Sequence, residues 1–175
     1  RFVFFFYKRL HSKFSTYLIP YLLLLLTIVI SRVIYPISDL KFIEHLHFLI
    51  PVPMMIILIC LLLTSNIAMI SGTICSILIS MMYQNDLNIL LYLFFSSCVA
   101  TFSCNKIYKR SDLVKAGNAI GFINVCIIFT IGISTDISSS IWFLYHGIIG
   151  FTNGFLCSML SFAFLPYLES VFKIT

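Results

Sequence analysis

Long apolar stretches separated by short polar segments dominate this chain. An α-helix needs about 20 apolar residues to cross the hydrocarbon core of a bilayer. None of the stretches alternates apolar and polar residues with a period of two, so a transmembrane β-barrel is not expected. Since lipid offers the backbone no hydrogen-bond partner, we predict an all-α, polytopic transmembrane helix bundle. The predicted helices are Tyr17–Ile34, His47–Thr64, Asn66–Tyr83, Leu87–Cys104, Leu113–Ile133 and Ile141–Pro166.

The second and third predicted helices must be separate elements. Read as one helix they would be about 55 Å long, which exceeds the thickness of a bilayer. The polar residues 64–66 supply a turn between them, and Ser65 or Asn66 is expected to cap the following helix. Pro51 and Pro53 lie early in the second stretch, so its first turn is expected to be kinked or unwound.

The composition identifies lipid as the solvent for most of the surface. Of the 175 residues, 61% are hydrophobic and 10% are charged, whereas soluble domains average about 45–50% apolar and about 25% charged residues. The length suits a single transmembrane domain, residues 1–175. The cysteines all lie inside apolar stretches without a C-x-x-C pair, so we interpret them as apolar packing residues.

The basic residues predict how the chain is oriented. They gather in three places, and six crossings put all three on the same side of the membrane. Because positive residues mark the cytoplasmic side, we expect a multi-pass protein with a cytoplasmic C-terminus. The opening residues 1–7 are interpreted as the truncated end of a preceding helix that arrives from outside. The residues in these three places are Lys8, Arg9 and Lys13, then Lys106, Lys109, Arg110 and Lys115, and finally Lys173, whereas Arg32 and Lys41 fall on the other side.

Small residues on the last two predicted helices suggest where helices approach closely. The fifth helix contains Gly117 and Gly121, and the sixth contains Gly150 and Gly154. A glycine pair spaced four apart lets a neighbouring backbone come near. We therefore expect these glycines to contribute to helix packing, although the sequence does not fix which pair meets.

Three asparagines on the same two helices are the leading candidates for a function inside the membrane. They are Asn118, Asn124 and Asn153. Polar groups in a span need partners, and one reading is hydrogen bonding between helices, worth about 0.6–2 kcal/mol each. The other reading, a pocket that senses a ligand or signal, stays open.

No catalytic constellation is present in the sequence. Metalloprotease, hydrolase, P-loop and dinucleotide-binding patterns are all absent. No charged pair lies deep in a predicted span, which disfavours an ion-coupled transporter. A small transporter or a substrate-binding membrane subunit nevertheless remains the alternative function.

Several segments resemble the seven-transmembrane receptors with an intracellular HD hydrolase domain. They are residues 110–117 (RSDLVKAG), 150–154 (GFTNG) and 165–175 (LPYLESVFKIT), with 62–68 (LLTSNIA) similar to that family's turn between its second and third helices. The resemblance spans most of the chain, and residues 165–175 carry most of its weight.

The resemblance implies a larger bacterial protein in the cytoplasmic membrane. An extracellular sensor domain would precede the seven helices, and a cytoplasmic HD phosphohydrolase would follow them. Characterised members cleave cyclic di-AMP with a divalent metal pair. None of those metal ligands is in this chain, so no catalytic residue, cofactor site or metal site is carried over. The implied partners are the lipid bilayer and the protein's own sensor and HD domains. A homo-oligomer is a further option, and no nucleic acid is expected.

Five residues near the cytoplasmic ends are expected to couple the membrane domain to the hydrolase. Pro166 is expected to disrupt the sixth helix. After it, Leu-x-x-x-Phe spacing predicts a short amphipathic turn at the membrane surface. Together these features would form a connector to the HD domain. The five residues are Arg110, Asp112, Pro166, Glu169 and Phe172.

Overall fold

The computed structural model describes residues 13–38, 46–104, 110–135 and 139–172. Within these ranges the chain forms six α-helices and one short 3₁₀-helix, with no strand, so the all-α prediction is confirmed. The expected end of a preceding helix at residues 1–7 lies outside the described residues. In chain order the elements are α2 (Lys13–Ser38), η1 (Leu46–Leu49), α3 (Val52–Leu62), α4 (Ser65–Met82), α5 (Leu87–Cys104), α6 (Arg110–Ser134) and α7 (Ser140–Phe172).

Five of the helices are long and apolar enough to cross a membrane, namely α2, α4, α5, α6 and α7. The second predicted span is different. The chain forms η1, leaves the helical path at Ile50 and Pro51, and resumes a helix at Val52. The expected unwinding at the prolines is therefore present, and it divides the segment into two pieces.

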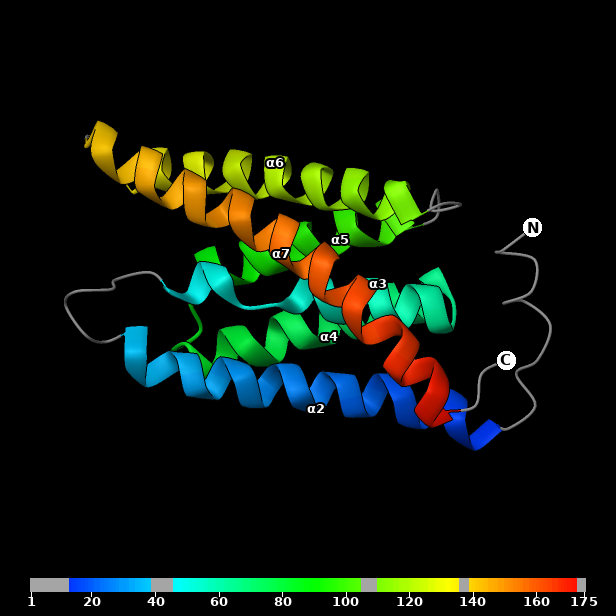
Figure 1. Ribbon diagram of the computed structural model, residues 1–175. Helices are drawn as coiled ribbons and strands as arrows, with labels where there is room; N and C mark the ends of the chain where they lie inside the picture. Colours follow the sequence, from blue (N-terminus) through cyan, green and yellow to red (C-terminus); the bar gives the residue numbers. More distant parts are fainter. Residues whose placement is uncertain (1–12, 39–45, 105–109, 136–138, 173–175) are drawn as a thin grey trace.

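The short helix α3 forms the centre of the bundle. Figure 1 shows α2 and α6 on opposite sides of the molecule, with α3 between them and α7 crossing obliquely in front. Helix α3 packs against α2, α4, α5 and α7. A helix that is hydrophobic all round must be enclosed by protein, and nearly every α3 side chain is buried. The outer helices instead expose large apolar side chains, as a lipid-facing surface requires, among them Leu22, Leu25 and Leu26 on α2 and Ile70, Ile74 and Ile77 on α4.

The turns between helices follow local side-chain chemistry. Thr64, not Ser65 or Asn66, caps α4, because its hydroxyl oxygen accepts a hydrogen bond from the amide of Ile67 at 3.5 Å. The cap therefore lies one residue before Ser65, the nearer of the two expected positions.

Pro166 does not end the last helix. Helix α7 continues through it to Phe172 as one element of 33 residues, so the prediction of a disrupted helix is wrong. Proline removes a single amide donor, whereas unwinding a span would expose several backbone groups to lipid. The helical path therefore costs less than a break at this position.

Candidate functional site

The most unusual feature of the core is the break between η1 and α3. The amide of Val52 would be the helical partner of the Phe48 carbonyl, but it donates to the Ile50 carbonyl at 2.9 Å instead. Phe48 and Ile50 are buried, with 2% and 0% of their surface exposed. A buried carbonyl without a partner costs about 1–3 kcal/mol, so the break needs hydrogen-bond donors from elsewhere.

Side chains of α5 and α7 supply those donors. The hydroxyl of Tyr92 on α5 donates to the Phe48 carbonyl at 2.8 Å. The amide nitrogen of Asn153 on α7 donates to the Ile50 carbonyl at 3.4 Å and to the Tyr92 hydroxyl at 3.2 Å. Both side chains are fully enclosed. The Tyr92–Asn153 pair therefore satisfies irregular backbone that lipid could not solvate.

Helix α7 continues this contact with a stripe of polar residues spaced four apart, which places them on one face. The thiol of Cys157 donates to Asn153 Oδ1 at 3.2 Å. One turn later the hydroxyl of Ser161 lies 3.3 Å from the carbonyl of Met54 on α3 and 2.7 Å from that of Cys157. Two turns of α7 are thus tied to the break and to the start of α3.

The four predicted glycines form the contact between α6 and α7. A Cβ atom built on Gly154 would overlap the backbone nitrogen of Gly121 and lie 2.6 Å from its Cα. A Cβ on Gly121 would lie 2.8 Å from a backbone oxygen of α7, and one on Gly117 would overlap Ser158. The structure therefore brings the two glycine pairs together with the backbones in direct contact, as small residues allow in membrane helices.

Asn124 also contributes to the contact between α6 and α7, which we call the α6–α7 seam. Its amide nitrogen donates to the Gly150 carbonyl at 3.3 Å. Its Oδ1 atom is buried and has no hydrogen-bond partner among the described residues. The side chain consequently adds one interhelical bond to the glycine contact.

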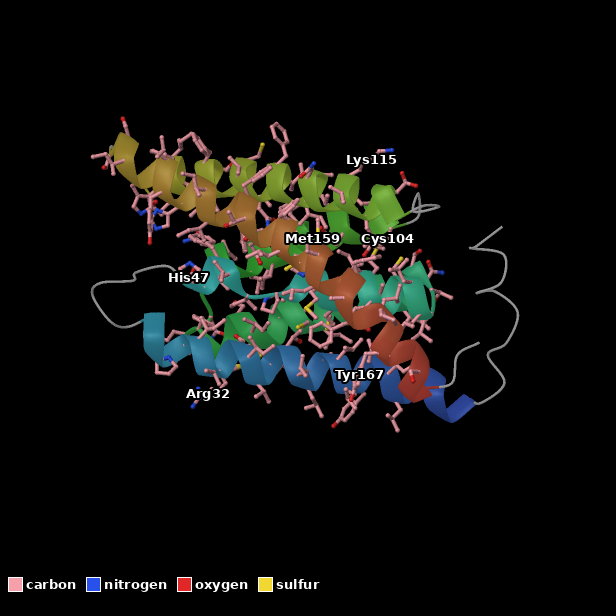
Figure 2. All side chains as sticks on the ribbon, in the orientation of Figure 1. Arg32, His47, Cys104, Lys115, Met159 and Tyr167 are labelled. Carbon is pink, nitrogen blue, oxygen red and sulfur yellow. The ribbon has the colours of Figure 1, made fainter. Side chains whose placement is uncertain are left out.

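Aromatic side chains surround η1 at its end of the bundle. The ring of Phe48 lies 6.0 Å from that of His146 on α7, and His146 stacks on Trp142 with centroids 4.2 Å apart. On the other side, the hydroxyl of Tyr83 donates to the Ser31 carbonyl of α2 at 3.3 Å. Figure 2 labels His47 of η1 at this end. The ring of Tyr83 lies 6.2 Å from that of His47 on η1. The aromatic group formed by Phe48, Tyr83, Trp142 and His146 therefore connects η1 with α2, α4 and α7.

Comparison with known proteins assigns the chain to a family. All of its residues, 1–175, match the family described as 7TM receptor with intracellular HD hydrolase. The chain belongs to this family. Its described residues provide the helical membrane part of such a receptor, and the family description names a hydrolase without a substrate. No curated protein and no solved structure matches this chain.

The structure separates the three predicted asparagines of this 7TM receptor domain. Asn153 and Asn124 are buried and bonded to neighbouring elements. Asn118 is exposed on the outer face of α6. Only Asn153 reaches the break, so the asparagines do not form one shared pocket.

The predicted coupling residues lie at two helix ends of the receptor domain. Asp112, in the first turn of α6, accepts a hydrogen bond from Lys115 at 3.0 Å. Pro166 is exposed within α7. The side chains of Arg110, Glu169 and Phe172 lie outside the described residues, although their backbones belong to α6 and α7.

Sequence reasoning missed Tyr92, Cys157 and Ser161. The four-residue spacing of Asn153, Cys157 and Ser161 was visible in the sequence and could have indicated a polar stripe. Nothing in the sequence marks Tyr92, because its role depends on the position of the break. Among the described residues no group of three or more His, Cys, Asp or Glu is placed to hold a metal ion.

Proposed function

We propose that this domain anchors a cytoplasmic HD hydrolase that cleaves cyclic di-AMP, and that it signals to this hydrolase through α7. The extracellular sensor domain and the metal pair of the hydrolase belong to the same proposal. One observation carries it. Helix α7 is a single continuous element that contacts the aromatic group near its start, the break at its middle, and then runs on to Phe172.

The contacts of α7 suggest how a signal would travel. A displacement of η1 would act on His146 through Phe48 and on Asn153 through the Ile50 carbonyl. Both residues belong to one helix, and a packed helix moves as a rigid body by small shifts or rotations. The C-terminal end of α7 would then change its position relative to the rest of the bundle.

The orientation proposed for this mechanism puts the C-terminal end of α7 in the cytoplasm. Figure 2 shows Lys115 and Tyr167 toward one end of the bundle and His47 toward the other. Lys115, near the start of α6, thus lies toward the end where α7 finishes. This distribution supports a cytoplasmic C-terminus in a bacterial cytoplasmic membrane.

Replacing Pro166 with alanine tests the signalling role. The P166A change adds the missing amide donor and stiffens α7 near its C-terminal end. In membranes containing the full-length protein, we expect cyclic di-AMP hydrolysis to change by about fivefold or more, the lower range of typical coupling between sites. The control is Phe164→Leu, an exposed residue on the same helix. Unchanged hydrolysis in P166A would leave only the anchoring role, and a full-length protein without cyclic di-AMP hydrolysis would contradict the substrate.

A transporter remains the second candidate, because discontinuous helices often form substrate sites in transporters. The break between η1 and α3 has this form. Under this alternative, the Asn153 carboxamide would hold the substrate beside the break. Uptake into vesicles containing the full-length protein, lost in Asn153→Leu, would favour the transporter over the receptor.

A further inference from the structure

The lipid-facing surface of α6 carries one polar side chain that the described structure does not satisfy. Asn118 is exposed and lies within the apolar span Asp112–Ser134. Among the described residues its carboxamide makes no hydrogen bond. By the rise of an α-helix it lies about 9 Å along the axis from Asp112, which places it inside the hydrocarbon layer if Asp112 marks the interface.

Two exposed threonines in the spans, by contrast, do find partners. Thr130 on α6 donates to the Cys126 carbonyl at 2.9 Å, and Thr152 on α7 donates to the Ile148 carbonyl at 2.9 Å. A hydroxyl can bond to its own helix in this way. The carboxamide of Asn118 has two donor hydrogens and an acceptor, and none of them is used within the described chain.

We propose that α6 forms a symmetric contact with α6 of a second copy of this chain, in which the two Asn118 carboxamides bond to each other. A carboxamide is complementary to itself, because each one supplies the donor and the acceptor that the other lacks. All copies have the same orientation in a membrane, so a two-fold contact is parallel and places each residue beside its own counterpart. Asparagine side chains drive association of membrane helices for this reason.

The surroundings of Asn118 fit a second copy. The adjacent outward residues Ala119, Phe122 and Cys126 are exposed and uncharged, and the small ones permit close approach. Figure 1 shows α6 on the opposite side of the bundle from α2, the first described helix, so α2 does not cover α6. Lys115, one turn before Asn118, points away from the bundle (Figure 2), and its charge is paired with Asp112 at 3.0 Å, so a parallel contact does not bring two unpaired charges together.

The experiment measures association of the full-length protein in lipid vesicles by energy transfer between labelled copies, at several protein-to-lipid ratios. We expect concentration-dependent dimers, and Asn118→Leu should weaken association about fivefold or more, which corresponds to about 1 kcal/mol at 25 °C. Asn118→Gln retains the carboxamide and should dimerise like the parent protein. Thr152→Leu removes an exposed polar group that bonds to its own helix, so it should have no effect.

A second measurement identifies the occupant directly. In the native membrane, and in a Cys126→Ala background because Cys126 is itself exposed on this face, Asn118→Cys should give a disulfide between two copies on mild oxidation, whereas cysteine at the exposed position 152 on α7 should not crosslink. A parent protein that stays monomeric at every ratio would overturn the proposal. Equal dimerisation of Asn118→Leu would also overturn it, and so would a crosslink from position 118 to a different protein.

Discussion

At the scale of single residues, Asn153 makes more hydrogen bonds at the break than any other described side chain. Its carboxamide bonds to Ile50, Tyr92 and Cys157 at once. We expect Asn153→Leu to lower the free energy of unfolding by about 1–3 kcal/mol, because it removes buried hydrogen bonds to the Ile50 carbonyl and to the Tyr92 hydroxyl. For a chain of this size that loss corresponds to about 2–4 °C in melting temperature per kcal/mol. Thermal unfolding of the purified protein in detergent measures the change.

A double-mutant cycle with Tyr92→Phe separates the pair from general destabilisation. The two changes share a hydrogen bond, so their effects should be less than additive by about 0.5 kcal/mol or more. The control Thr152→Val alters an exposed hydroxyl and should change stability by less than about 0.5 kcal/mol. Strict additivity of Asn153→Leu and Tyr92→Phe would mean that the bond between the two side chains contributes nothing.

Individual residues could be singled out from the sequence only where their chemistry is local. The glycines and Asn153 could be singled out because small and polar residues are unusual in apolar spans. Asn118 and Asn153 are the same residue type in similar contexts, yet one faces outward and the other reaches the core. Which face of a helix is enclosed depends on the arrangement of all the helices, and the sequence alone did not reveal it.

At the scale of helices, the seam between α6 and α7 depends on the absence of side chains. We expect Gly154→Ala to lower the free energy of unfolding by about 1–3 kcal/mol, because its Cβ would meet the backbone of Gly121. Gly147 on the same helix is the matched control. A Cβ there would lie 3.5 Å from Phe129, which is an ordinary contact, so Gly147→Ala should be neutral or stabilise by up to about 1 kcal/mol.

Melting temperatures of these two variants decide whether close backbone contact holds the seam. Equal changes in melting temperature for Gly154→Ala and Gly147→Ala would show that the close backbone contact between α6 and α7 does not contribute to stability. That result would also remove the basis for reading the two glycine pairs as packing positions.

Helix prediction was accurate where length and polarity set the boundaries and inaccurate where a single proline was decisive. The spans of α4 and α5 agree with the predicted ranges to within a residue or two. Proline had opposite outcomes in two places. The two prolines at 51 and 53 accompany a break that α5 and α7 can satisfy. Pro166 lies inside α7, and the helix continues through it to Phe172.

At the scale of the whole molecule, the decisive question is whether α7 transmits rotation or only holds the hydrolase at the membrane. Alanines inserted between Glu169 and Ser170 follow Leu168, the last residue of α7 that is buried among the side chains the structure describes, and are designed to leave the packing of the bundle intact. One inserted residue rotates whatever follows by about 100°, and four rotate it by about 40° with a shift of about 6 Å. If α7 signals as a rigid helix, cyclic di-AMP hydrolysis by the full-length protein should change strongly with one or two alanines and recover with four. Hydrolysis that is independent of insert length would mean that the helix is a tether, and the contacts of α7 with the break would then serve stability alone.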